Sequence, residues 1–158
     1  MHGFWRAALY AAALGILAHP VGQALPRRWF DPERFPWRLY GWERNGAVYD
    51  AVKIRVWKDR VPDMSKILGD MVKKQAPRHG SAAETEAVLL ETCVAECVHW
   101  ALMPLSLPIL AIWRSPWCIL LYIGYNLLGN LPFILIQRYN RPRMLALYKR
   151  LKRREERT

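Results

Sequence analysis

Acidic residues are scarce in this chain, in which 13 Asp and Glu residues stand against 24 Lys and Arg residues and leave a net charge of +11. Cysteine is scarce too, and the three cysteines lack the spacing of a zinc site or a disulfide framework. We therefore expect Cys93, Cys97 and Cys118 to be reduced, small hydrophobic residues within helices. The chain also has no internal repeat, Rossmann glycine fingerprint or phosphate-binding loop, which argues against a repeat protein and a nucleotide-binding fold.

Apolar residues are concentrated in blocks. They make up 53% of the chain, yet the mean hydropathy is −0.08, so very polar segments must separate them. A basic excess of this size is typical of proteins that bind nucleic acid or anionic lipid, and of membrane proteins with basic inner loops. Tryptophans near the ends of the apolar blocks favour the membrane and argue against a nucleic acid partner, since indole rings prefer the headgroup region. They are Trp5, Trp29, Trp37, Trp100, Trp113 and Trp117.

Three stretches are long and apolar enough to cross a bilayer. Residues 4–25 hold a single charge, and about 20 residues at roughly 1.5 Å each span a hydrocarbon core of about 30 Å. We expect this helix to be retained, because His19-Pro20 interrupts it where a signal peptide would have its small-residue cleavage motif. The second span belongs to a long helix over 81–113, and the third covers 117–137. The expected fold is an all-α membrane protein, a single domain over 1–158 with three transmembrane helices.

The segment between the first two spans should lie along the membrane interface. Residues 26–80 begin with closely spaced prolines among aromatic residues, which prevents regular structure there. A turn is expected at Asn45-Gly46, because this pair favours positive φ. Apolar residues within 62–72 recur at the spacing of an amphipathic surface helix. Ser81 is the predicted N-cap of the long helix, and Glu84 completes a capping box.

Basic charge predicts the orientation in the membrane. The tail at 138–158 holds seven Arg and two Lys residues against two Glu residues, and Arg27-Arg28 follow the first span. Because basic loops stay on the cytoplasmic side, residues 26–99 and the C-terminus should lie inside and the turn at Arg114 outside. We expect a multi-pass protein of the cell membrane, with the lipid bilayer as a partner.

A cluster of carboxylates and a histidine follows along the long helix. Glu91 and His99 share one face at i and i+8, and Glu96 precedes His99 by three residues. Ionisable groups near a membrane are costly to desolvate unless paired, so these residues are functional candidates. Glu96 or Glu91 would orient His99 as a base that activates a hydroxyl group. Alternatively, the acids form a structural clamp with Arg138 or Arg141, or the cluster binds a divalent metal, although the Glu-x-x-His pair of di-metal bundles occurs here only once.

Hydrogen-bond donors gather where the third span ends. The cluster consists of Gln137, Arg138, Asn140, Arg141 and Arg143. Guanidinium groups suit phosphates and carboxylates, so the cluster is a candidate site for the phosphates of an acyl donor, with simple positive-inside anchoring as the alternative. Three further binding candidates are Asn130, which lies inside the third span near Pro132, and the neighbouring Trp57 and Lys58, although Trp57 would also serve as an interface anchor.

Together these motifs resemble the glycosyl-4,4'-diaponeurosporenoate acyltransferase family, which performs the last step of staphyloxanthin-type carotenoid biosynthesis. The most specific part is Gln137–Arg143, with the sequence Gln-Arg-Tyr-Asn-Arg-Pro-Arg, preceded at a matching distance by Glu96-x2-His99. Arg55–Lys58 and Asn130-x-Pro132 add to it, and the resemblance extends over most of the chain after residue 26.

The resemblance implies an integral membrane enzyme that esterifies a sugar hydroxyl of a glycosylated carotenoid, or of a related glycolipid, with a fatty acyl group. Acyl-CoA or acyl carrier protein would be the donor, and no cofactor or metal site is expected. Such transfer needs a base, an oxyanion stabiliser and an apolar groove for the acceptor. We expect His99 as the base, Glu96 as its orienter, and Arg138 or Arg141 at the oxyanion or the donor. A small non-catalytic membrane scaffold and a metal-dependent membrane hydrolase remain the alternative functions.

Overall fold

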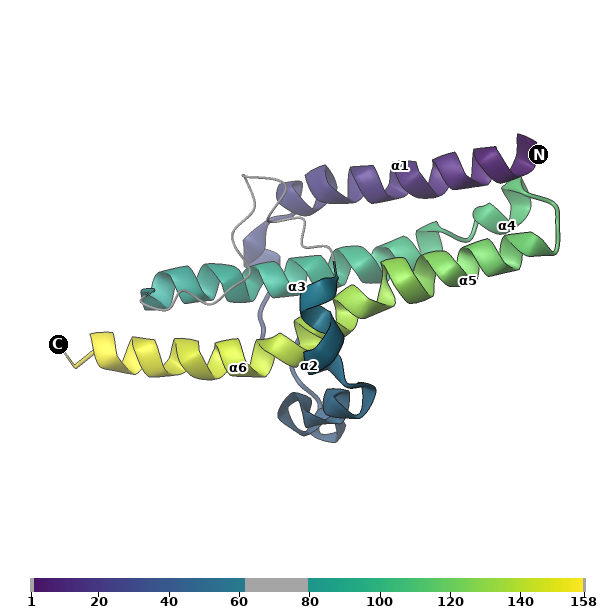
Figure 1. Ribbon diagram of the computed structural model, residues 1–158. Coiled ribbons are helices and arrows are strands. Elements are labelled where there is room, and N and C mark those ends of the chain that lie inside the picture. The colour runs from purple at the N-terminus through teal and green to yellow at the C-terminus, as the bar shows by residue number, and fades with distance from the viewer. Residues whose placement is uncertain (1, 62–79, 158) are drawn as a thin grey trace. The chain divides into compact units, whose positions relative to one another are not determined.

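The computed structural model describes residues 2–61 and 80–157, which are mostly helical and contain no strand, and this confirms the expected all-α fold (Figure 1). The chain divides into a first unit, Met1–Leu25 with Ala95–Ile134, and a second unit, Pro26–Val94 with Leu135–Thr158. Helices α3 and α6 contribute residues to both units. The α-helices are α1 (His2–Ala24), α2 (Ile54–Trp57), α3 (Ala82–Leu105), α4 (Ile109–Ile112), α5 (Trp117–Gly129) and α6 (Leu131–Glu155). The 3₁₀ helices are η1 (Arg27–Trp29), η2 (Gly41–Val52) and η3 (Lys58–Arg60).

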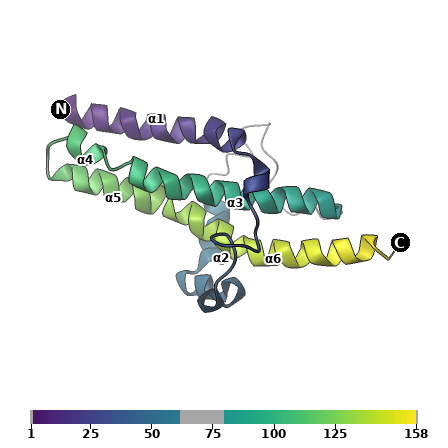
Figure 2. The same cartoon turned by 180° about the vertical axis from the view of Figure 1, so that it is seen from behind.

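In the first unit, small residues let α1 approach α4 closely. Gly3, Ala7 and Ala11 recur at every fourth position of α1 and therefore form one ridge along the helix. Ala7 and Ala11 are buried against Ile109 of α4, and a Cβ atom on Gly3 would lie 2.8 Å from Cδ1 of Trp113. Both views of the chain show α4 between α1 and α5 (Figures 1 and 2). The small residues thus let α1 pack closely on α4, and aromatic side chains such as Phe4 and Tyr10 of α1 add contacts to Trp113 and to the Leu105 carbonyl.

The long apolar helices are interrupted where the sequence has proline or asparagine. The expected single helix over 81–113 is divided, because α3 ends just after Pro104 and α4 begins after Pro108, and proline lacks an N–H donor for the helix ladder. The third span is likewise made of α5 and the start of α6, which meet at Asn130. Beyond residue 137 the expected tail continues α6 as far as Glu155, since leucine, lysine and arginine favour helix.

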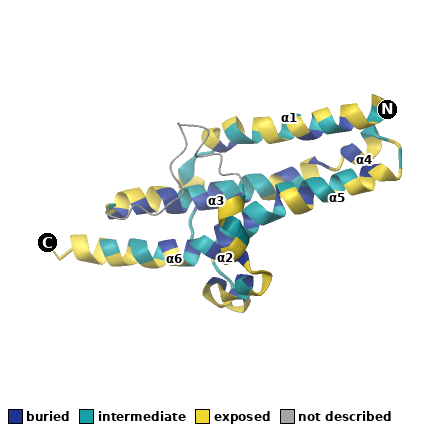
Figure 3. Ribbon diagram, in the orientation of Figure 1, coloured by how far each residue is buried: buried dark blue, intermediate teal, exposed yellow. Residues whose placement is uncertain are grey.

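Many apolar residues of the first unit are exposed, and exposed residues are yellow in Figure 3. Leu9 and Ile16 of α1 are 72% and 74% exposed, and Leu128 of α5 is 78% exposed. Soluble proteins avoid large apolar surfaces of this kind, whereas a lipid environment favours them. Three helical stretches, His2–Ala24, Ala82–Ile112 and Trp117–Glu155, have the length and hydropathy to cross a membrane, which confirms the expectation of three such helices.

The second unit is built from short elements rather than from long helices alone. Within η2 the chain turns at Arg44, Asn45 and Gly46, which all have positive φ, as expected for an Asn-Gly pair. Residues from η2 and α2 then pack on α6, where Tyr49, Ile54 and Tyr139 form a buried apolar cluster. A second cluster joins the first half of α3 to the second half of α6 and comprises Val88, Leu89 and Met144, with Leu145 and Tyr148 beside them.

The start of α3 is capped as the sequence predicts. The Glu84 backbone N–H donates to Ser81 Oγ at 3.2 Å, and the Ser81 N–H donates to the Glu84 carboxylate at 3.2 Å. These reciprocal bonds satisfy donors that a helix start leaves without partners. The amphipathic helix expected within 62–72 falls outside the described residues.

Candidate active site

In the first unit, His99 of α3 is held by two neighbours from α5 and α6. Its ring stacks on Phe133, with the centroids 4.6 Å apart and the planes 8° from parallel. Its Nδ1 atom lies 3.0 Å from Oδ1 of Asn130. These two contacts fix the orientation of the ring. Because the residue is only half-buried, part of it stays accessible. A histidine held in this way is a candidate general base, and its catalytic role stays a prediction.

Asn130 belongs to a chain of polar side chains inside the apolar first unit. Its Nδ2 donates to Asn126 Oδ1 at 3.2 Å, and Asn126 Nδ2 donates both to Ser106 Oγ at 3.0 Å and to the Tyr122 carbonyl at 2.9 Å. Asn126, Asn130 and Ser106 are all buried. A buried amide without partners would cost several kcal/mol in a medium that cannot hydrogen-bond. The chain of bonds therefore both stabilises these side chains and determines how they point.

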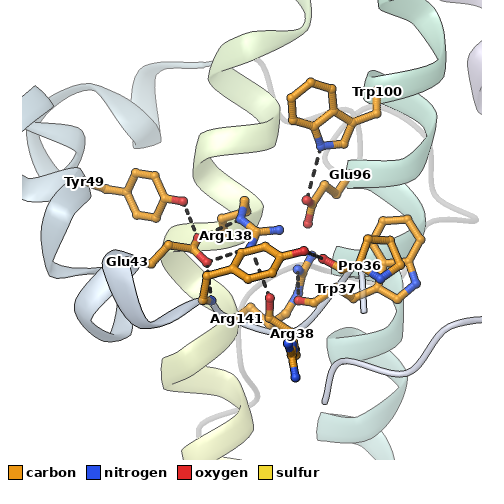
Figure 4. A network of polar contacts seen from close by, with 10 residues as sticks. Pro36, Trp37, Arg38, Glu43, Tyr49, Glu96, Trp100, Arg138 and Arg141 are labelled. Atoms are coloured by element: carbon orange, nitrogen blue, oxygen red, sulfur yellow. Dashed lines mark hydrogen bonds and ion pairs between the residues drawn. The ribbon is translucent and has the colours of Figure 1, made fainter. Parts of the chain in front are cut away.

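Glu96 is buried on α3 one turn before Trp100, whose indole N–H donates to its carboxylate at 3.3 Å (Figure 4). The ring nitrogen of His99 that faces α5 and α6 is engaged by Asn130 rather than by a carboxylate. The role of Glu96 as orienter of His99 stays a prediction.

In the second unit, Glu43 and Arg138 form a buried ion pair (Figure 4). Arg138 Nε and Nη2 donate to the two carboxylate oxygens of Glu43, each at 2.7 Å, and Nη2 also donates to the Arg38 carbonyl at 3.2 Å. The same carboxylate accepts from the Tyr49 hydroxyl at 2.5 Å and from the Tyr40 backbone N–H at 2.7 Å. One carboxylate thus ties two segments of the 26–61 region to α6.

The electrostatics of this pair follow from its contacts. Burial by itself would raise the pKa of Glu43, but the hydrogen bonds from Arg138, Tyr40 and Tyr49 and the charge of Arg138 outweigh it, so the pKa of Glu43 is lowered. Burial and the neighbouring Glu43 carboxylate raise the pKa of Tyr49, which therefore keeps its proton. Glu43 is a hydrogen-bond acceptor and Tyr49 a donor throughout the neutral range.

Arg141 is fully buried and also serves the second unit. Its Nη1 donates to the Trp37 carbonyl at 2.7 Å, Nε to Thr92 Oγ1 at 3.1 Å and Nη2 to the Thr92 carbonyl at 3.0 Å. Figure 4 shows its side chain reaching the 36–38 segment. Arg138 and Arg141, which the sequence suggests as donor-binding residues, thus have their guanidinium groups engaged within the protein.

Arg143 differs from these two arginines because it is exposed. Its Nη1 donates to the Tyr139 carbonyl at 2.5 Å, and its guanidinium carbon lies 3.8 Å from the centre of the Tyr139 ring. With Lys149 it contributes positive charge to a surface groove of about 460 Å³, whose other lining residues are Leu39, Asn45, Pro142, Leu145 and Ala146. Of the other members of the cluster, Gln137 is buried and Asn140 is half-buried.

Two further predicted residues make local contacts in the second unit. The Trp57 indole donates to the Val52 carbonyl at 2.8 Å, and Lys58 pairs with the exposed Asp59 at 2.9 Å. Their role in substrate binding stays a prediction.

Glu91 pairs with Arg27 at 2.7 Å, with both side chains partly buried. The pair links the segment after α1 to α3 within the second unit. Arg27 was expected only as a basic flank of the first span, so its pairing with Glu91 is new.

Several residues that build these sites carry no obvious sequence signal. Glu43 lies in a turn beside Asn45-Gly46, where an acidic side chain is ordinary. Asn126 gives a weak signal, because an amide inside an apolar helix must find a partner. Among the described residues, no group of three or more His, Cys, Asp or Glu side chains could hold a metal ion.

Comparison with known proteins gives one consistent result. A family model described as glycosyl-4,4'-diaponeurosporenoate acyltransferase matches residues 26–150. The chain is similar to the glycosyl-4,4'-diaponeurosporenoate acyltransferase of Staphylococcus aureus strain MRSA252, with 29% identity over 139 residues that cover 87% of this chain and 82% of the relative. It is 28% identical, with the same coverage, to the protein of that name from S. aureus strain bovine RF122 / ET3-1. No solved structure matches.

Proposed function

This chain belongs to the glycosyl-4,4'-diaponeurosporenoate acyltransferase family, and we propose that it esterifies a sugar hydroxyl of a glycosylated carotenoid, or of a related glycolipid, with a fatty acyl group. The family resemblance seen in the sequence is thereby confirmed. The observation that carries the proposal is the match over residues 26–150, which includes both the His99 segment and the Gln137–Arg143 motif. Membership identifies the chain as an acyltransferase and argues against the scaffold and hydrolase alternatives.

The apolar surface of the spans supports an acceptor that is itself dissolved in the bilayer. A polyene or acyl chain can lie against helices such as α1 and α5, whose apolar side chains are exposed. The sugar of such an acceptor would stay at the headgroup level, where the ends of the spans lie. This arrangement would bring a hydroxyl nucleophile to the protein without removing the lipid from the membrane.

His99 is the proposed base of the transfer. It would accept the proton of the sugar hydroxyl while the hydroxyl oxygen attacks the carbonyl carbon of the acyl donor. In a thioester donor, the bond from that carbon to sulfur then breaks, and the leaving thiolate takes the proton from the imidazolium. Glu96 is proposed to assist this base from the same helix. Glu91 has a partner in Arg27, so its contribution would be to hold α3 in place.

Arg143 is the member of the arginine cluster that we propose to meet the donor. Acyl-CoA and acyl carrier protein both carry their acyl group on a phosphate-bearing arm, which guanidinium groups bind well. The groove is lined by the exposed Arg143 and by Lys149, which pairs with Glu33 on the surface, whereas Arg138 and Arg141 are buried and engaged inside the second unit. In this proposal Arg138, Arg141 and Gln137 support the segment that presents Arg143.

The positions of the charges support a cell-membrane protein whose C-terminus is cytoplasmic. Six basic residues within residues 149–154 and 157 extend beyond the last apolar stretch, and a further pair follows α1. Basic segments of this kind remain on the inner side. Cytoplasmic acyl donors would then reach the second unit directly.

The function is tested by product formation in a host that makes the glycosylated carotenoid but lacks an acyltransferase for it. Mass spectrometry of lipid extracts should show a new acyl ester with the wild-type chain and none with His99→Ala, although the variant is still found in the membrane. His2→Ala, at an exposed histidine of α1, is the matched control and should give the wild-type amount. Wild-type protein that yields no ester of any glycosylated lipid would contradict the proposed function, and an active His99→Ala variant would remove His99 from it.

The donor site is tested separately with purified protein in lipid nanodiscs. Arg143→Gln should raise KM for acyl-CoA about tenfold, the effect of losing roughly 1.4 kcal/mol from a charge-assisted bond, and should change kcat little. Arg60→Gln, at an exposed arginine of the same unit, is the control. An Arg143→Gln variant with unchanged KM for both acyl-CoA and acyl carrier protein would exclude the groove as the donor site.

A further inference from the structure

In the hydrogen-bond chain of the first unit, the backbone carbonyl of Tyr122 determines which atom of each side chain donates and which accepts. The Tyr122 backbone carbonyl can only accept a hydrogen bond, so the Asn126 atom that lies 2.9 Å from it must be the amide nitrogen. The second hydrogen of that nitrogen points to Ser106 Oγ at 3.0 Å, whose own hydrogen is used on the Met103 carbonyl at 2.7 Å. Ser106 therefore accepts from Asn126. Both contacts give the same orientation of the Asn126 amide.

The orientation of the Asn126 amide determines that of Asn130, which in turn faces His99. With its nitrogen engaged, Asn126 turns Oδ1 towards Asn130, and the atom of Asn130 at 3.2 Å must be the donating nitrogen. Oδ1 of Asn130 then faces Nδ1 of His99 at 3.0 Å, and an amide oxygen has no hydrogen to give. The hydrogen between them must therefore belong to the histidine.

We propose that Asn130, oriented by Asn126, is a positioning residue that holds neutral His99 in the tautomer with its hydrogen on Nδ1 and its lone pair on Nε2. This is the less favoured tautomer of neutral imidazole in water, so the protein must select it. Stacking on Phe133 fixes the plane of the ring, and the Asn130 contact fixes its rotation within that plane. Asn130 thus acts through His99, in place of the substrate-binding role expected from its sequence position.

The catalytic use of this lone pair rests on the proposed function, in which His99 is the base. A base must present an unprotonated nitrogen to the hydroxyl whose proton it takes, and the partner of the other ring nitrogen decides which nitrogen that is. In this chain that partner is the neutral amide of Asn130, which is oriented by Asn126 and, through it, by the Tyr122 backbone carbonyl. We call this chain of hydrogen bonds the relay.

The tautomer can be observed directly in the full-length protein in lipid nanodiscs. The protein is labelled with ¹⁵N-histidine, and the ring nitrogens are recorded at alkaline pH, where imidazole is neutral. The His99 signals are assigned by their loss in His99→Gln. We expect a protonated, pyrrole-type Nδ1 and an unprotonated, pyridine-type Nε2. A spectrum with the hydrogen on Nε2 would overturn the proposal, whatever the activity of the protein.

Two variants of Asn130 separate positioning from general packing. Asn130→Leu removes the acceptor and should shift the ring to the Nε2–H form, with a fall in kcat on the order of 10²-fold and a nearly unchanged acceptor KM. Asn130→Asp keeps an oxygen towards Nδ1 and should retain the Nδ1–H form. If the tautomer is unchanged in Asn130→Leu but reversed in Glu96→Gln, the relay proposed here is wrong and Glu96 is the orienter.

The NMR spectrum and the activity measurements also test the tautomer of His99 separately from its proposed catalytic role. The wild-type spectrum reports the tautomer even if no ester is formed, and His99→Gln serves only to assign the His99 signals. A wild-type Nδ1–H spectrum together with an active His99→Ala variant would uphold the relay and remove only the catalytic role of His99.

Discussion

Replacing Glu43 by glutamine removes the charge that lies opposite the buried Arg138 guanidinium. The wild-type carboxylate accepts two bonds of 2.7 Å from Arg138 and has no solvent exposure. Removing one member of a buried ion pair costs about 3–5 kcal/mol, because the remaining charge stays desolvated. Glutamine keeps one oxygen that can accept a bond, so we expect a loss near the lower end, about 3 kcal/mol. For a chain of this size that corresponds to a fall in Tm of roughly 6–12 °C.

The assay is thermal unfolding in detergent, followed by tryptophan fluorescence. Asp59→Asn is the matched control, since Asp59 pairs with Lys58 on the surface with 78% of its side chain exposed. An exposed pair contributes at most about 1 kcal/mol, so this variant should shift Tm by only a few degrees. Equal Tm values for Glu43→Gln and Asp59→Asn would refute the view that the Glu43–Arg138 pair holds the second unit together.

The pH dependence of the same variant provides a second check. The folded-state pKa of Glu43 lies below its ordinary value of 4.5, so the ionised pair stabilises the fold fully above that value. The stabilisation is lost as pH falls below 4.5 and passes through the folded-state pKa. The Tm difference between wild type and Glu43→Gln should therefore be constant near neutral pH and shrink in acid. A difference that grows in acid would contradict a lowered folded-state pKa of Glu43.

Three smaller stability changes follow from local geometry, each measured as a shift in Tm. Gly46→Ala should cost about 1–2 kcal/mol, because Gly46 has φ of 87° and a Cβ there would lie 3.3 Å from its nearest neighbours; an unchanged Tm would contradict this. Ser81→Ala should cost about 1 kcal/mol by removing the cap of α3, and a loss below a few tenths would mean that the cap contributes nothing. Gly3→Ala should lower Tm, because its Cβ would lie 2.8 Å from Trp113, whereas Gly15→Ala, with open space around it, should not; equal effects would argue against close packing of α1.

Much of the fold could be predicted because it depends on local sequence. The turn at Asn45-Gly46 and the capping box of Ser81 and Glu84 were expected from residues within three positions of each other, and both are found. The membrane spans follow from the length of apolar runs alone. The division of the second span was missed, although Pro104 and Pro108 are visible in the sequence, because hydropathy is insensitive to helix breaks.

The contacts of the candidate site could be predicted only in part. His99 and the arginine cluster could be identified from the sequence because ionisable residues beside apolar runs are costly to desolvate, which marks them as functional candidates. Their partners were not found, since Glu43 is 95 residues from Arg138 and Asn130 is 31 residues from His99. The periodicity of a sequence shows which residues share a face of one helix. It does not show which residue of a turn contacts a helix far along the chain.

The sequence by itself determined that this chain is a basic, three-span, all-α membrane protein of an acyltransferase family, because apolar blocks, charge and a heptapeptide motif are written along the chain. Only the tertiary structure decided that Arg138 and Arg141 are buried among protein acceptors while Arg143 is exposed, and that an asparagine faces Nδ1 of His99. The physical reason is the short range of the hydrogen bond. A hydrogen bond forms within about 3 Å, and packing alone decides which distant side chains come that close.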